Sequence, residues 1–185
     1  MTHTNTQSEL AASLQAISDL LPTLSETEWH RPHNGKWSLA QEMEHLWIST
    51  QGTTFLFKKT GRTTWRPTDQ PSRSYEVIVE QYQSALAARN GFTNQNPAVE
   101  SDILERSAQV AGWPVATTNL LNAVAGIPES DLSGFTVWKH PLLGPLTGRE
   151  MLLFTIHHTR HHHESLARKQ RAIEQSINGG KADPQ

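Results

Sequence analysis

Apolar residues recur every three or four positions along most of the chain, which is the period of an α-helix. Near the N-terminus, the spacing of Leu10, Leu14 and Ile17 predicts an amphipathic helix over residues 7–21. Pro22 follows and ends it, because proline lacks the N–H group that a helix interior needs. The chain therefore begins with one helix that presents an apolar face to a core.

Two later helices have clear N-terminal signals. Ser38 is followed three residues later by Gln41, and Thr147 is followed in the same way by Glu150. Each pair predicts a capping box, in which the two residues satisfy each other's backbone N–H groups at the helix start. The sequence thus fixes where the second and the last helix begin.

Strand signals are almost absent, and the pattern favours an all-α fold. The predicted helices cover residues 7–21, 38–58, 75–90, 114–124 and 147–171, with a short one over 100–109. Pro114 is expected in the first turn of its helix, and residues 133–146 contain too much Pro and Gly for a long helix or a sheet. We expect a single helical domain over residues 6–175, with flexible ends at 1–5 and 176–185.

Composition narrows the chemistry. The 185 residues include ten His and no Cys, so disulfides, thiolate metal sites and a cysteine nucleophile are excluded. A net charge of -2 and a pI near 6.5 give no electrostatic basis for binding nucleic acid or an anionic membrane. No apolar stretch approaches the ~18 residues of a membrane helix, and the polar start does not resemble a signal peptide. We expect a soluble, cytoplasmic globular protein whose metal, if any, is held by His and carboxylates.

Five of the histidines fall in the last predicted helix, within the sequence HHTRHHH at 157–163. Such a run can be a solvated polar face, or it can hold a metal through two His at positions i and i+4. On a helical wheel His158 and His162 lie at the edge of the apolar arc. His157 and His161 lie on the far side, where we expect solvent. The inward pair, His158 and His162, is therefore the candidate for metal binding.

A zinc or nickel site needs at least one more protein ligand. His45 is within a well-capped helix, on a face that it shares with Glu42 and small residues. This face suits a cleft wall, although a plain surface position explains it equally well. The zinc-protease motif HExxH is absent.

Three motifs together resemble the DinB/YfiT-like superfamily of metal-binding four-helix bundles. They are Gly35-Lys36-Trp37-Ser38 leading to Glu44-His45-Leu46, the stretch HPLLGPLT at 140–147 followed by Glu150, and His158-x-x-x-His162. They occur in the expected order over residues 37–166. The resemblance implies a four-helix bundle of DinB/YfiT type with short extra helices and irregular loops. It also implies a divalent ion, zinc or nickel, on His45, His158 and His162.

The resemblance also implies functions. Characterised relatives include thiol-dependent transferases and isomerases, and others are described as metal-dependent hydrolases. Two hypotheses follow: a metal-dependent enzyme that activates a low-molecular-weight thiol or water for a small-molecule substrate, and a non-catalytic, stress-related metal-binding domain. Glu42, one turn before His45, is the candidate to orient a ligand or act as a base, although an acidic residue near a helix start often just complements the helix dipole. The family pattern has Gln or His where this chain has Ser165, and the resemblance implies a homodimer.

Overall fold

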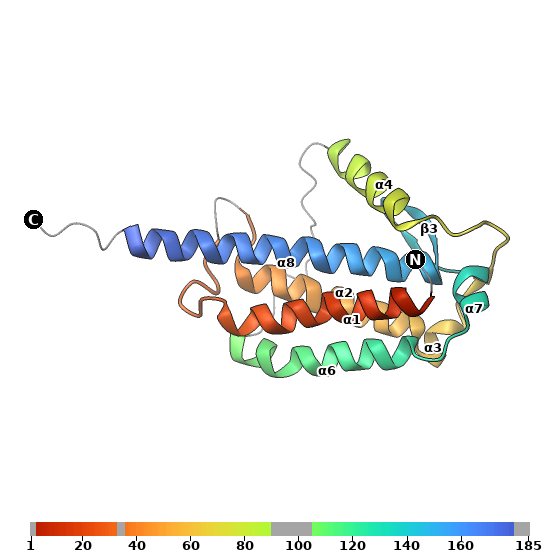
Figure 1. The fold of residues 1–185 in the computed structure, drawn as a ribbon, viewed down its shortest axis with the longest axis horizontal. Coiled ribbons are helices and arrows are strands. Elements are labelled where there is room, and N and C mark those ends of the chain that lie inside the picture. The colour runs from red at the N-terminus through yellow and green to blue at the C-terminus, as the bar shows by residue number, and fades with distance from the viewer. Residues whose placement is uncertain (1–2, 33–35, 90–104, 180–185) are drawn as a thin grey trace, which may run out of the picture.

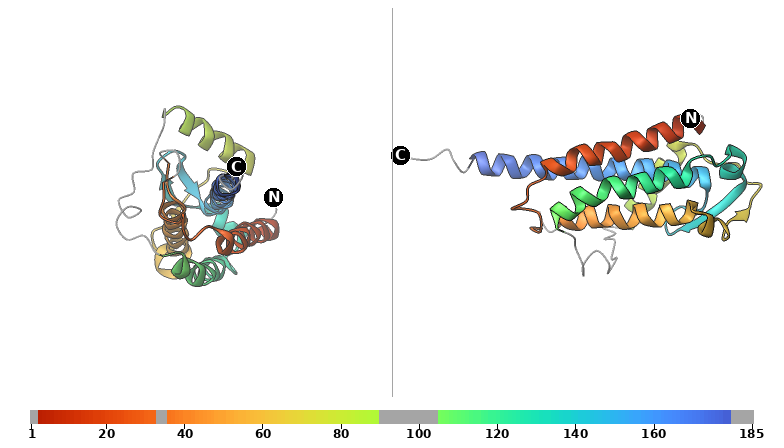
Figure 2. Two further views of the ribbon diagram at one scale, coloured as in Figure 1. Left: turned by 90° about the vertical axis from the view of Figure 1, so that its left-hand side faces the viewer. Right: turned by 90° about the horizontal axis from the view of Figure 1, so that it is seen from below.

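The computed structural model describes residues 3–32, 36–89 and 105–179, and four long helices form its centre (Figure 1). These bundle helices are α1 (His3–Leu20), α2 (Leu39–Phe57), α6 (Arg106–Val124) and α8 (Gly148–Gly179). α1 packs against α8 and α6, and α2 packs against the same two helices on the other side. Figure 2 shows this arrangement end-on. The expected all-α four-helix bundle is confirmed.

The core is made by the apolar faces that the sequence pattern predicted. Leu10, Leu14 and Ile17 of α1 are each at most 1% exposed. Trp113 of α6 is fully buried against this face, and its indole N–H donates to the Leu14 carbonyl at 3.3 Å. Both predicted capping boxes are also present, at Ser38 with Gln41 and at Thr147 with Glu150. Local sequence signals therefore set the start of α2 and α8.

The prediction that Pro114 begins a helix is wrong. α6 begins eight residues earlier, at Arg106, and Pro114 lies inside it. This earlier start is joined to the rest of the fold by a tertiary contact, in which Arg106 Nε donates to the Leu24 carbonyl at 2.8 Å. Of the short helix expected over 100–109, residues 100–104 lie outside the described residues and 106–109 belong to α6.

The prediction that residues 133–146 are too broken for a sheet is also wrong. They form the antiparallel strands β2 (Phe135–His140) and β3 (Gly144–Thr147), with β1 (Arg66–Pro67) on the other edge of β2. Gly144 has φ of +70°, a left-handed conformation that lets the chain turn between β2 and β3. The hairpin lies at the end of the bundle where α8 begins (Figure 1). Short helical turns complete the connections: η1 (Leu21–Thr23), α3 (Lys59–Arg62) and α7 (Glu129–Gly134).

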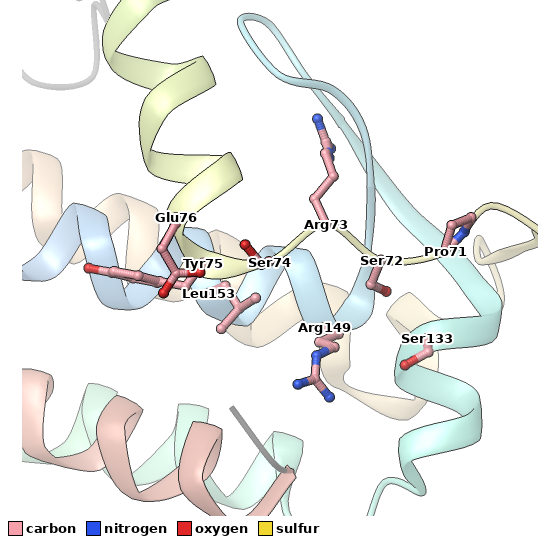
Figure 3. Close-up of a pocket in the computed structure, with 9 residues that line it drawn as sticks. All are labelled: Pro71, Ser72, Arg73, Ser74, Tyr75, Glu76, Ser133, Arg149 and Leu153. Atoms are coloured by element: carbon pink, nitrogen blue, oxygen red, sulfur yellow. The ribbon is translucent and has the colours of Figure 1, made fainter.

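One helix, α4 (Tyr75–Ala87), lies outside the bundle and packs on α8. Arg73, just before α4, donates through Nε to Glu150 Oε1 at 2.8 Å and through Nη2 to Glu150 Oε2 at 3.0 Å. Figure 3 shows Leu153 of α8 beside Tyr75 at the start of α4. Leu153 lies off the main apolar face of α8, and it is only 2% exposed because α4 packs on α8 there.

The helix ends reach further than expected. α8 continues to Gly179 rather than ending near residue 171, and α1 already begins at His3. Both helices therefore include parts of the segments 1–5 and 176–185 that we expected to be flexible. In the described part of the chain, no helix is both long enough and apolar enough to cross a membrane.

Candidate metal centre

The bundle brings together three histidines from two helices. α2 carries His45, and α8 carries His158 and His162 one turn apart. The Nε2 atom of His158 lies 2.8 Å from Nε2 of His45 and 3.2 Å from Nε2 of His162. The donor atoms of all three lie within 4.8 Å of one another. We refer to His45, His158 and His162 as the three-histidine group.

Glu42 contacts the three-histidine group through His162. It lies one turn before His45 on α2, is 3% exposed, and its Oε1 lies 2.7 Å from Nδ1 of His162. A charged carboxylate only accepts hydrogen bonds, so His162 carries a proton on Nδ1 and, when neutral, directs a lone pair from Nε2 toward the other two histidines. A carboxylate that holds a histidine in this way is the usual partner of a metal-binding imidazole.

Two residues of α8 hold Glu42 in turn. Lys169 donates to Glu42 Oε2 at 2.5 Å and also to the Trp37 carbonyl at 2.6 Å, while Ser165 donates to the same Oε2 at 3.1 Å. Ser165 occupies the position at which the family pattern often has Gln or His, and here its hydroxyl orients the carboxylate. The spacing of His162, Ser165 and Lys169 places all three on one face of α8.

Burial and neighbouring charges shift the pKa values of these groups. Desolvation alone would raise the Glu42 pKa, but the hydrogen bond from His162 and the charge of Lys169 outweigh it and lower the pKa to about 2. Burial, followed by the neighbouring His162, lowers the pKa of His45 to about 3. Burial also lowers the pKa of His158 far below its ordinary value. At neutral pH, Glu42 is therefore charged, and His45 and His158 are neutral.

The donor set fits a divalent cation. Neutral imidazole nitrogens are ordinary zinc and nickel ligands. Two nitrogens bound to one tetrahedral zinc ion lie roughly 3.3 Å apart, since each is ~2.0–2.1 Å from the metal. The Nε2 separations of 2.8 and 3.2 Å are close to that value. Lone pairs that face one another at this range repel unless a proton or a cation lies between them, so a shared proton or a bound cation can satisfy these nitrogens.

The three-histidine group lies in the wall of a cleft of about 1210 Å³. Along α8, the side toward its N-terminus faces α4 and the β2–β3 hairpin and is lined by aromatic and aliphatic side chains. We call this the hairpin half, which includes Tyr82, Leu86, Trp138, His140 and Phe154. The side toward the C-terminus of α8 carries basic groups, and we call it the cationic half, made of Lys36, Trp37, Arg168 and Lys169. The metal ligands thus lie between two regions of different character.

The remaining histidines of α8 do not join the group. His161 is exposed, as expected. His157 is not on a free surface as we expected, because its ring lies edge-on to Tyr75 and Tyr82 of α4, at centroid distances of 6.4 and 5.8 Å. The helical wheel could not show this contact, because it depends on a helix that packs outside the bundle. His163 is half-buried.

Two residues of the site were missed in the sequence. Lys169 had a usable signal, because it continues the 158–162–165 face of α8 by one more turn. His140 was noticed within a motif but given no role, and it enters the cleft because β2 turns it inward. Its place depends on a hairpin that the sequence pattern did not predict.

A second pocket of about 480 Å³ lies between the start of α4, α7 and α8, and it is drawn in Figure 3. Its two arginines, Arg73 and Arg149, point in opposite directions there. Each is ion-paired, Arg73 with Glu150 and Arg149 with Glu129. These charges therefore stabilise the attachment of α4 and α7 to α8.

A four-helix bundle with a three-histidine group in a cleft wall is typical of a candidate metal-binding protein. Comparison with known protein families identifies the family. The family model of the DinB superfamily matches residues 9–166. This match covers most of the chain and includes all three members of the three-histidine group, so the protein belongs to the DinB superfamily. A comparison with curated proteins finds no match.

Proposed function

We propose that this protein is a metal-dependent enzyme that binds one divalent ion, zinc or nickel, through His45, His158 and His162. The observation that carries the proposal is the convergence of the three Nε2 atoms, with Glu42 fixing the tautomer of His162. Three protein ligands are typical of catalytic rather than structural sites, because they leave a coordination position open.

The reaction class that fits is activation of a small nucleophile beside a bound substrate. A divalent ion on three histidines, when bound, lowers the pKa of a coordinated water or thiol and so supplies a nucleophile near neutral pH. We therefore propose a thiol-dependent transferase or a hydrolase acting on a small molecule in the cleft. The chain has no Cys, so a thiol nucleophile must arrive as a substrate.

The chain's own residues have separable tasks in this proposal. His45, His158 and His162 hold the ion, and Glu42 keeps His162 in the binding tautomer. Lys169 and Ser165 keep Glu42 charged and in place. The Glu42 carboxylate is occupied by these contacts, which supports an orienting role for it over that of a general base.

Metal content tests the binding site. Elemental analysis of purified protein should give close to one zinc or nickel ion per chain, and less than a tenth of that in His158→Ala. The matched control is His163→Ala, which removes a half-buried histidine of the same helix that does not line the cleft and should keep the full metal content. Circular dichroism confirms that both variants fold. Full metal content in folded His158→Ala would show that the proposed ligand set is wrong.

Turnover tests the enzyme. Metal-loaded protein is assayed with glutathione, coenzyme A or bacillithiol against a reactive electrophile, and separately with a panel of esters and amides. Activity with one of these, lost on chelation and restored by adding back the ion, supports the proposal. Full metal content without turnover of any of them favours a non-catalytic metal-binding domain instead.

A further inference from the structure

The hairpin half of the cleft contains one imidazole ring among aromatic neighbours, that of His140. The ring centroid of His140 lies 4.6 Å from Phe154, 5.2 Å from Trp138 and 5.8 Å from Tyr82. All three contacts are edge-to-face, so they fix the plane of the imidazole. Phe154 also stacks on His158 at 5.5 Å, which places His140 one aromatic ring away from the three-histidine group.

The backbone decides which nitrogen of His140 carries the proton. Nδ1 accepts hydrogen bonds from the amide N–H groups of Leu142 at 3.0 Å and Leu143 at 3.2 Å. A nitrogen that accepts has no proton of its own, so the proton of the neutral ring is on Nε2. Burial lowers the pKa of His140 to about 4, which keeps the ring neutral at pH 7. His140 is therefore a donor of fixed direction.

Among the described residues, no group accepts a hydrogen bond from this donor. Within the described part of the chain, the hydrogen bonds of the His140 ring are those that Nδ1 accepts. The residue is 8% exposed, and it lines the cleft. A polar N–H group in a mostly apolar region costs free energy unless something accepts its hydrogen bond, and a ligand in the cleft can do so.

We propose that the hairpin half is a substrate subsite for an apolar group that carries an uncharged acceptor oxygen, and that His140 Nε2–H donates to this oxygen. The acceptor is a ketone, ester or amide carbonyl, because the basic side chains that would attract an anion line the other half of the cleft. A group that can only donate is disfavoured, since Nε2 offers it no lone pair. The role of this subsite in catalysis rests on the proposed function, whereas binding to it does not need a metal.

Two matched probes isolate the hydrogen bond. Acetophenone has a carbonyl, and α-methylstyrene has nearly the same shape with a methylene group in place of the oxygen. Each is titrated into the full chain, with and without zinc, and followed by ¹H–¹⁵N NMR of the His140 ring and the Leu142 and Leu143 amides. Wild-type protein should bind acetophenone about 3- to 10-fold more tightly, the range expected for one neutral hydrogen bond.

The variant His140→Asn removes the donor while keeping the turn. Its side-chain oxygen can accept the N–H of the residue two positions on, as Asn does in many turns, so the hairpin should persist. We expect His140→Asn to bind both probes with equal affinity. The matched control is His30→Asn, which replaces an exposed histidine on another surface and should keep the wild-type preference for acetophenone over α-methylstyrene.

The outcomes separate this inference from the proposed function. A preference for acetophenone that persists in His140→Asn would overturn the inference, and so would the absence of binding of both probes at millimolar concentration. Neither result depends on metal content or turnover. Failure of the metal analysis, in contrast, would refute the proposed function and leave the probe preference unchanged.

Discussion

Glu42 allows the sharpest test of how the bundle supports its candidate metal site. The change Glu42→Gln keeps the size and one acceptor oxygen of the side chain but removes its charge. In the protein, this carboxylate accepts from His162, Lys169 and Ser165 and is 3% exposed. The amide oxygen of Gln can still accept a hydrogen bond from His162, but the NH₂ group cannot accept a hydrogen bond from Lys169.

The structure sets the size of the effect on stability. Lowering the Glu42 pKa from 4.5 to about 2 corresponds to about 3 kcal/mol in favour of the charged form, at ~1.36 kcal/mol per pKa unit. Breaking a buried ion pair by removing one partner costs a similar amount, about 3–5 kcal/mol. We therefore expect metal-free Glu42→Gln to unfold with a free energy about 3 kcal/mol below that of wild type at pH 7.

The pH dependence has a definite sign. Because the folded-state pKa of Glu42 lies below its unfolded value, its contribution is present above about pH 4.5 and is lost as the pH falls toward 2. The stability difference between wild type and Glu42→Gln should therefore shrink over that interval. Urea denaturation of metal-free protein at a series of pH values measures it.

The same change should weaken metal binding. Partners that orient a metal-binding histidine typically contribute 10- to 100-fold in affinity, so the zinc Kd of Glu42→Gln should rise by that factor. Competition with a chromophoric chelator measures the Kd. The matched control is Glu44→Gln, a neighbouring buried carboxylate that accepts a hydrogen bond from Gln109, and it should leave the zinc Kd within about 3-fold of wild type. Equal zinc affinity in Glu42→Gln and wild type would refute the orienting role.

Three further predictions concern the fold. Gly112→Ala should destabilise by about 1–3 kcal/mol in thermal unfolding, because an added Cβ would lie 2.4 Å from a ring carbon of Trp47; wild-type stability would contradict this packing. Glu150→Gln should loosen α4 and raise hydrogen exchange over residues 75–87. Hydrogen bonds from Arg73 lower the Glu150 pKa, so the stabilisation of α4 by the Arg73–Glu150 ion pair is present above about pH 4.5 and is lost in acid. Unchanged hydrogen exchange of Glu150→Gln at pH 7 would show that this ion pair does not hold α4 on α8. Ser38→Ala should cost about 1 kcal/mol in denaturant unfolding, and Ser38→Asp, another good N-cap, should lose less.

The choice between the histidines of α8 shows how far sequence periodicity reaches. The helical wheel separated His158 and His162 from His157 and His161 because the direction of a side chain on a regular helix follows from residue number alone. The bundle places the chosen pair inward, as predicted. The wheel gave the wrong surroundings for His157, because α4 covers that face of α8.

The sequence by itself determined the approximate positions of the long helices apart from the start of α6, the capped starts of α2 and α8, and the inward histidine pair. These depend on local spacing and on hydrogen bonds between residues three or four positions apart. Tertiary structure decided the rest. His45 meets His158 across 113 residues, Lys169 reaches Glu42 across 127, and the hairpin turns His140 into the cleft. Such contacts depend on how separate elements pack, and no local pattern in the chain encodes the distance between two helices.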